Sequence, residues 1–365
     1  MKKNRFAVIE AAILAVVLFL ISACQGGKRA DKIQTIKISD TQVDSIDLSA
    51  VFDIRQIVDI DTSVCRLGRI VKVKCCGDDI YVWDNLGIHR FSGDGNLVCN
   101  IGNKGRGHNE YLAIGDFDVS GSTVAVLDMY KKVLLYDTDG NYKSSNDLDF
   151  YAVGCLLTAD RLVLTSGYQE ITEKFHALRL SDLTEESAFG ECRENELTYR
   201  HFMQQQYFYR DGQGRILYHE LMNNTVSLLT DGEFKPLYEF DLYGKTPPAD
   251  FWNQRFENVM DVVTKLTDRG YCYGLPLYSV DGNRHIFAFN DNGEMKLALA
   301  DTKQKTSSIS SVVCYDNVFK ASPYSSIQIN LNSSSDISIC VPSDKYCNTP
   351  SGDNPIIIRL SFCER

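Results

Sequence analysis

The stretch Ile80-Tyr-Val-Trp-Asp84, followed by the turn Asp94-Gly95-Asn96, decides the fold because it recurs. The second copy is Val124-Ala-Val-Leu-Asp128 with the turn Asp139-Gly140-Asn141, so equivalent residues lie 44 to 45 positions apart. Short apolar runs closed by Asp-Gly turns are typical of antiparallel strands. A repeat of this length is typical of propeller blades. We therefore expect an all-β fold.

Weaker copies follow over residues 161–183, 216–233 and 286–296, and a last apolar run lies near Ile356. Together they predict a six-bladed β-propeller of four-stranded antiparallel blades over residues 32–365, a fold that closes exposed sheet edges. N-terminal residues would complete the last blade with the C-terminal strands. Helical periodicity is convincing once, which predicts one inserted helix at about residues 247–267.

The N-terminus has the pattern of an export signal. Lys2, Lys3 and Arg5 precede an apolar run over residues 11–21, and Ser22-Ala23 stand directly before Cys24. The pattern predicts a lipoprotein signal peptide over residues 1–23, lipidation of Cys24, and a tether over residues 24–31. Gln25 favours the outer membrane. An ordinary secretory peptide or a signal anchor is the alternative.

The charge balance limits the choice of partners. The chain has 38 Lys and Arg against 48 Asp and Glu, a formal net charge of −10. An acidic surface repels phosphate backbones, so no nucleic acid partner is expected. No polybasic segment suggests a membrane patch either.

Cysteine usage indicates mostly buried thiols. Eleven of the 12 cysteines follow Cys24, and none forms a Cys-x-x-Cys pair. Because the number is odd, at least one thiol is unpaired or bonded between chains. Most lie in strand-like apolar runs, where cysteine acts as a small hydrophobe. A short loop closed by Cys340 and Cys347 is one candidate disulfide.

One segment resembles a known family. The run from Phe91-Ser-Gly-Asp-Gly95 through Ile101-Gly-Asn-Lys-Gly-Arg-Gly107 to Glu110-Tyr111 is similar to the signature of six-bladed β-propeller lipoproteins of Bacteroides-type bacteria, with His108-Asn109 in place of Pro-Gly. Val58–Thr62 resembles the first blade of that family and Asp353–Ile357 its closing strand. The resemblance implies fold and lineage, but no activity. Related propellers with NHL-type repeats mostly bind proteins, glycans or small ligands, and a few are enzymes.

The Gly-rich part of this segment is the first candidate ligand site. It lacks the Gly-Lys-Ser/Thr of a phosphate loop, so we interpret it as a connection between blades. Binding residues concentrate on loops held by rigid scaffolds. The candidate ligand-binding side chains here are Lys104, Arg106, His108 and Glu110.

An aromatic-rich stretch from Tyr199 to Tyr209 is the second candidate. Aromatic rings offer apolar faces to sugars, and Tyr207 and Tyr209 are the residues we select for this role. Packing in the core of a strand is the alternative. Tyr243, Phe251 and Trp252, near the expected helix, form a further candidate of the same kind.

Metal and cofactor patterns are weak. The histidines at positions 89, 108, 176, 201, 219 and 285 show no metal-ligand spacing. Asp137-Thr-Asp-Gly-Asn141 mimics the start of a calcium loop but lacks the distal Glu. We expect neither a metal nor a cofactor and select no catalytic residue, although a propeller can gather single histidines at its central channel.

Two hypotheses follow. The first is a cell-envelope lipoprotein whose propeller is a binding platform for a glycan, peptide or protein partner. The alternative is a propeller enzyme, a lyase or hydrolase acting on glycans or peptides with a channel metal or carboxylates. The enzyme hypothesis predicts titratable side chains converging from different blades with perturbed pKa values. The oligomeric state is left open by the sequence.

Overall fold

The computed structural model describes residues 33–129, 131–167, 172–192, 206–321, 328–331, 336–348, 350 and 352–363. The chain separates into two compact units, Met1–Gln34 and Thr35–Arg365. The second unit, with Gln34 at the start of its first strand, holds every element below. The predicted signal peptide, Cys24 and the tether lie outside the described residues.

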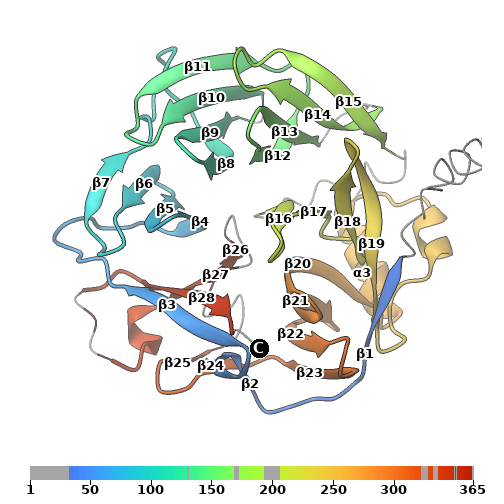
Figure 1. The fold of residues 1–365 in the computed structure, drawn as a ribbon. Helices are drawn as coiled ribbons and strands as arrows, with labels where there is room; N and C mark the ends of the chain where they lie inside the picture. The colour runs from blue at the N-terminus through green and yellow to red at the C-terminus, as the bar shows by residue number, and fades with distance from the viewer. Residues whose placement is uncertain are drawn as a thin grey trace, which may run out of the picture. The chain divides into compact units, whose positions relative to one another are not determined.

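The described residues of this unit form seven sheets, which are the blades of a propeller (Figure 1). Blade 1 consists of β4 (Ile70–Cys76), β5 (Asp79–Asp84), β6 (Ile88–Phe91) and β7 (Leu97–Asn100). Blade 2 consists of β8 (Ile114–Ser120), β9 (Thr123–Asp128), β10 (Lys132–Asp137) and β11 (Tyr142–Asp147). Blade 3 consists of β12 (Ala152–Leu157), β13 (Arg161–Ser166), β14 (Glu173–Arg179) and β15 (Glu185–Glu191). In each of them, neighbouring strands pair antiparallel.

Two of the next three blades include a strand from the N-terminal part of the chain. Blade 4 consists of β16 (Phe208–Arg210), β17 (Ile216–His219), β18 (Thr225–Thr230) and β19 (Glu233–Leu242), with β1 (Gln34–Ile38) at its edge. Blade 5 consists of β20 (Cys272–Asp281), β21 (Arg284–Asp291), β22 (Glu294–Asp301) and β23 (Thr306–Ser310). Blade 6 consists of β26 (Gln328–Leu331), β27 (Ile337–Val341), β28 (Ile356–Phe362) and β3 (Phe52–Val58). Pairing of β28 with β3, for example Ile357 with Val58, joins the two ends of the ring as expected.

The structure confirms an all-β propeller of four-stranded antiparallel blades with one helix, but the predicted number of six blades was wrong, because the described residues form seven. The seventh is a three-stranded sheet of β2 (Ile46–Asp47), β24 (Val313–Tyr315) and β25 (Phe319–Ala321) at the outer edge of the ring in Figure 1. Its strands are too short to show alternation in the sequence. Strand β2 pairs parallel with β24 from the far end of the chain, so no local pattern indicates this sheet.

The repeated Asp explains why the two best sequence copies resemble each other. Asp84 and Asp128 each end the second strand of a blade and hold the loop that enters the blade. Asp84 Oδ2 accepts a hydrogen bond from Gly68 N at 2.6 Å, and Asp128 Oδ1 accepts one from Leu112 N at 2.9 Å. Buried backbone donors need such partners, so the Asp repeats along the chain with the loop that it closes.

Because neighbouring strands in a blade run in opposite directions, their connections fall on two faces. The upper face, as we name it, carries the connections from one blade to the next, such as residues 101–113, and the turns between second and third strands, such as 85–87. The lower face carries the other turns, such as 121–122 and 282–283. The insertion between β19 and β20 belongs to the upper face and contains η2 (Ala249–Asn253) and α3 (Val259–Asp268), near the predicted residues.

The eleven cysteines after Cys24 are described, and all are free thiols. The expected bond between Cys340 and Cys347 is therefore absent. Cys340 is buried on β27, where its Sγ lies 3.7 Å from Asn330 Nδ2, whereas Cys347 is exposed. Most of the others are buried or half-buried, as expected for cysteine used as a small hydrophobe.

Candidate ligand-binding cleft

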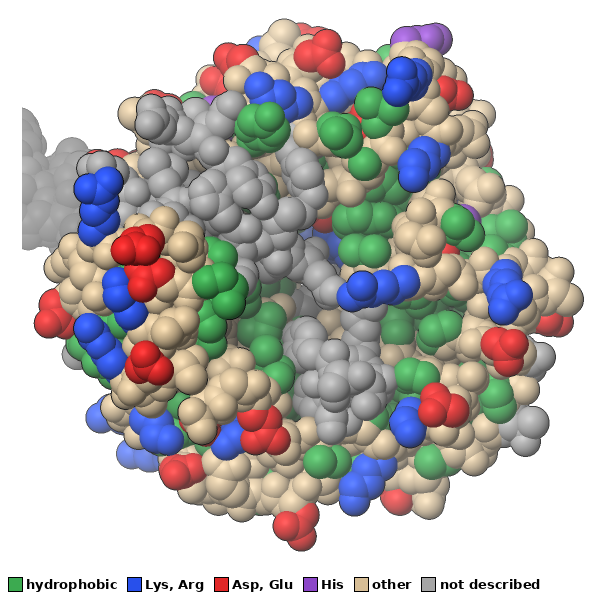
Figure 2. Space-filling model, turned by 180° about the vertical axis from the view of Figure 1, so that it is seen from behind, with side chains coloured by type: hydrophobic (Ala, Val, Ile, Leu, Met, Phe, Trp, Pro, Cys, Tyr) green, Lys and Arg blue, Asp and Glu red, His purple; other side chains and the backbone are tan. Residues whose placement is uncertain are grey.

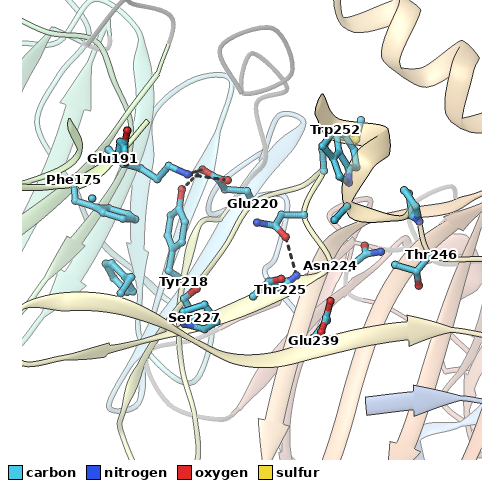
Figure 3. Close-up of a pocket in the computed structure, with 18 residues that line it drawn as sticks. Phe175, Glu191, Tyr218, Glu220, Asn224, Thr225, Ser227, Glu239, Thr246 and Trp252 are labelled. Carbon is cyan, nitrogen blue, oxygen red and sulfur yellow. Dashed lines mark hydrogen bonds and ion pairs between the residues drawn. The ribbon is translucent and has the colours of Figure 1, made fainter. Parts of the chain in front are cut away.

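A cleft of about 500 Å³ opens between blade 3, blade 4 and the helical insertion. Blade 3 contributes the upper ends of β14 and β15, and blade 4 contributes the turn between β17 and β18. Residues Thr246 to Trp252 close the other side. Figure 3 shows Phe175 and Tyr218 on one side of the cleft, Trp252 on the other and Glu220 between them.

Aromatic rings form much of the apolar wall. The rings of Phe175 and Tyr218 meet edge-on with centroids 4.6 Å apart, and Phe175 lies 4.5 Å from Phe234. Phe175 and Tyr218 are buried, whereas Phe234 and Trp252 are half-buried. Trp252 packs edge-on against the buried Phe251 of η2, at 5.0 Å. Phe234 and Trp252 thus combine a fixed position with an accessible ring surface.

Glu220 directly follows the second strand of blade 4, one position beyond the strand end that Asp84 and Asp128 occupy in blades 1 and 2. Its carboxylate extends into the cleft, where it accepts a hydrogen bond from the Tyr218 hydroxyl at 2.7 Å. Lys174 Nζ lies 3.3 Å from the same Oε1 atom. The repeated acidic position therefore contributes to the cleft wall in this blade.

The polar lining is rich in hydrogen-bond acceptors. Asn224 Oδ1 is buried and accepts no hydrogen bond from the described part of the chain. Of the described lining residues, Lys174 is basic, against Glu191, Glu220 and Glu239. The cleft therefore presents acceptors and net negative charge to a ligand.

The four predicted loop residues, Lys104, Arg106, His108 and Glu110, lie together on the upper face between β7 and β8. The first three are exposed, and the His108 ring meets Tyr142 edge-on at 5.4 Å. Glu110 instead closes the loop, because its Oε2 accepts a hydrogen bond from Gly107 N at 2.7 Å. None of the four lines the cleft.

Tyr207 and Tyr209 are both buried in the core. Tyr207 stacks behind Tyr218 with ring centroids 6.5 Å apart, and the Tyr209 hydroxyl donates to Gln206 O at 2.8 Å. Burial raises the pKa of Tyr209. Neither ring presents a face to solvent, so the alternative of core packing describes their placement, and their role with sugars stays a prediction. Tyr199 and His201 of the same stretch lie outside the described residues.

Trp252, from the further aromatic candidate, is the sequence-selected aromatic residue that does line the cleft. Glu220, Lys174, Tyr218 and Asn224 were missed. The available indication was an acidic residue at the end of the second strand: Glu220 in this blade, with a longer side chain, and Asp84 and Asp128 in blades 1 and 2. The contribution of Lys174 from another blade has no local pattern.

No group of three or more metal-ligating side chains occurs within the described ranges. In the turn that mimics a calcium loop, the Asp137 carboxylate binds the backbone of the turn itself. Its Oδ1 atom accepts hydrogen bonds from Asp139 N and Asn141 N at 3.0 and 2.9 Å. Burial lowers the pKa of His219 to about 3 and that of His285 to about 4, so both stay neutral at physiological pH.

Charged side chains do converge between the inner strands of blades 1 and 2. Lys72 Nζ lies 2.5 Å from Asp116 Oδ1, and Lys74 Nζ lies 3.3 Å from Asp118 Oδ1. Burial acts to lower the pKa of Lys72, but the nearby acidic groups, Asp116 first among them, together outweigh burial and raise that pKa. For Lys74 burial prevails and lowers the pKa. All four side chains are buried, so we interpret this group as a connection between blades.

Comparison with known proteins places the chain in a family. Residues 33–349 match the model of a family described as a domain of unknown function, DUF4934. The chain belongs to this family. No curated protein matches it. None of the helices in the described ranges is long and apolar enough to cross a membrane.

One solved structure supports the fold. A Bacteroides fragilis NCTC 9343 protein described as exported matches 91% of this chain and 100% of its own, with a TM-score of 0.70 and 16% identity. The extracellular domain of a one-component system from B. thetaiotaomicron matches 84% of this chain and 40% of its own, with a TM-score of 0.43 and 12% identity. BamB from Moraxella catarrhalis matches 83% and 78%, with a TM-score of 0.38 and 10% identity. The first of these structures therefore shares the fold of this chain.

Proposed function

We propose that the protein is a cell-envelope binding protein whose propeller holds a neutral glycan in the cleft between blades 3 and 4. The observation that carries the proposal is the pairing of accessible aromatic surface, at Phe234 and Trp252, with an acceptor-rich lining. A sugar ring offers C–H groups to an aromatic face and hydroxyl donors to carboxylate and amide oxygens.

The charge of the cleft favours a neutral ligand over an acidic one. Glu191, Glu220 and Glu239 outnumber Lys174, and the Lys174 ammonium already lies beside Glu220. Acidic sugars would meet like charge in a partly desolvated site. A neutral sugar hydroxyl instead supplies the donor that Asn224 Oδ1 lacks.

A glycan array followed by calorimetry tests this proposal. Trp252→Ala is expected to weaken binding of the best neutral glycan by about tenfold or more, as for an aromatic residue at the centre of an interface. Met260→Ala is the matched control, because Met260 is exposed in the same insertion but does not line the cleft. Binding that is equal in both variants, or selective binding of acidic glycans, would contradict the proposal.

Envelope attachment is a separate part of the proposal. It rests on the basic and apolar pattern before Cys24 and on the Ser22-Ala23 pair. Metabolic labelling with a fatty acid is expected to label the unmodified protein in its native host but not a Cys24→Ala variant. Equal labelling of both would refute lipidation at this cysteine.

A further inference from the structure

Four segments of the upper face form one continuous strip over blades 1 and 2, which we call the basic rim. They are residues 66–69, 85–87, 103–113, and 129 with 131–132. The first two are joined by a hydrogen bond from Arg69 N to Asn85 Oδ1 at 2.8 Å. The last two are joined by one from Met129 N to Ala113 O at 2.9 Å.

The second and third segments also touch. Gly87 lies so close to the Tyr111 hydroxyl that a Cβ added to it would come within 2.9 Å of that oxygen. Lys132 Nζ donates to His108 O at 3.2 Å, which links the third and fourth segments again. The strip is therefore held together by contacts along its length.

Positive charge is concentrated on the basic rim. It carries six basic side chains and one acidic one, Glu110, in a chain whose net charge is −10. Glu110 already accepts a hydrogen bond from the loop at Gly107 N. Asp84 and Asp128 directly precede two of the segments, but both are buried and accept hydrogen bonds from Gly68 N and Leu112 N of the rim. Asp61, Asp147 and Asp149 lie near the segments in the sequence, so the positive strip is narrow. The six basic residues are Arg66, Arg69, Lys104, Arg106, Lys131 and Lys132.

Large apolar side chains stand exposed on the same rim. Leu86 is 58% exposed, Met129 is 50% exposed and Leu112 is 44% exposed. Figure 2 shows Lys and Arg side chains among hydrophobic ones over the part of the ring that lies on the left in Figure 1. Turns normally carry polar residues, so three exposed apolar tips on one rim indicate a contact surface.

We propose that the basic rim docks on the surface of an anionic phospholipid membrane. Basic side chains near such a surface are attracted by lipid phosphates, and Leu or Met side chains enter the boundary between headgroups and acyl chains. The combination of basic and exposed apolar side chains favours a membrane over a nucleic acid as the partner. A nucleic acid would use the charges but leave Leu86 and Met129 in water. This inference is independent of the ligand in the cleft.

Hydrogen–deuterium exchange on the full chain tests the proposal. The chain is reconstituted with vesicles of phosphatidylcholine alone or mixed with phosphatidylglycerol, so that any N-terminal attachment is the same in both. We expect residues 103–113 to exchange about tenfold or more slowly on the anionic vesicles, with the protection falling as salt is added. The lower-face turn 302–305 should not change.

Two pairs of variants make the test specific. Lys104→Glu with Arg106→Glu should abolish the protection, whereas Lys303→Glu with Lys305→Glu, the same charge change at exposed residues of the lower face, should keep it. Leu86→Ser with Met129→Ser should reduce it, whereas Ile57→Ser with Val98→Ser, at exposed apolar residues of outer strands, should not. The proposal is overturned by equal protection on both vesicle types, by loss of protection in either control, or by protection that needs another protein in place of lipid.

Discussion

Lys72 Nζ and Asp116 Oδ1 lie 2.5 Å apart between the innermost strands of blades 1 and 2, with 2% and 5% of their side chains exposed. The other carboxylate oxygen of Asp116 accepts a hydrogen bond from Cys155 N on blade 3, at 2.9 Å. One carboxylate therefore connects three blades. Removal of either Lys72 or Asp116 alone would leave the other as an unpaired buried charge.

Replacement of Lys72 by Met should strongly destabilise the propeller, because it leaves Asp116 as an unpaired buried charge. We expect a loss of about 3 to 5 kcal/mol in the free energy of unfolding, measured by urea denaturation. Lys72→Met with Asp116→Leu should lose less than the sum of the two single variants. Lys303→Met, at an exposed residue, should change the free energy by less than about 0.5 kcal/mol. Additive losses in the double variant would mean that the pair is not coupled.

Replacement of Gly140 by Ala should cost more than the same change at Gly121. Both glycines have positive φ, of 83° and 56°. A Cβ on Gly140 would lie 2.2 Å from Asn100 O, whereas a Cβ on Gly121 would meet nothing within 4 Å. Gly121→Ala should thus cost about 1 kcal/mol for the backbone conformation alone, and Gly140→Ala should cost clearly more. Equal shifts of the two thermal midpoints would show that the turn relaxes freely.

Acid should weaken the fold through His219 and His285. Their folded pKa values, about 3 and about 4, lie below the value of about 6.5 for an unfolded histidine. The unfolded chain therefore binds more protons between these limits, so their contribution to stability is present above about pH 6.5 and is lost as the pH falls toward 4. His285→Gln should flatten this pH dependence in urea denaturation, whereas His108→Gln, at an exposed residue, should leave it unchanged. An unaltered slope in His285→Gln would contradict the assignment.

Asp291 should anchor the start of the helical insertion. Its Oδ2 atom accepts hydrogen bonds from the Tyr243 hydroxyl at 2.5 Å and from Lys296 Nζ at 2.7 Å. Burial acts to raise the pKa of Asp291, but the bonds from Lys296 and Tyr243 prevail and lower it to about 2. Asp291→Ala should therefore speed trypsin cleavage after Lys245 by about tenfold or more, through easier local opening. Asp250→Ala, at an exposed residue of the insertion, should leave the cleavage rate unchanged.

The repeat that ends at Asp84 and Asp128 predicted the propeller. It is visible in the sequence because each Asp binds the loop that enters its own blade, so the same residue recurs from blade to blade. The pairing of β28 with β3 was predicted as well, since a ring must join its ends. Blade 7 was not predicted, because β2 has two residues and finds its partner β24 near the other end of the chain. Strands this short show no alternation of apolar and polar residues, and their pairing depends on the folded ring.

The candidate sites show the same division. Tyr207 and Tyr209 have the composition of a sugar platform, but alternation places both rings in the core. Trp252 lines the cleft only because the insertion folds beside blade 4. The basic rim was invisible as a sequence pattern, because its six basic residues come from four separate segments of an acidic chain.

The sequence by itself determined the strands, the Asp-Gly turns and the inserted helix, because period-two alternation, turn chemistry and helix periodicity act over a few neighbouring residues. The tertiary structure alone decided the seventh blade, the Lys72–Asp116 pair, the cleft around Glu220 and the basic rim. Each of these joins segments from different blades or from opposite ends of the chain. Their proximity is fixed by closure of the ring, which no local stretch of sequence encodes.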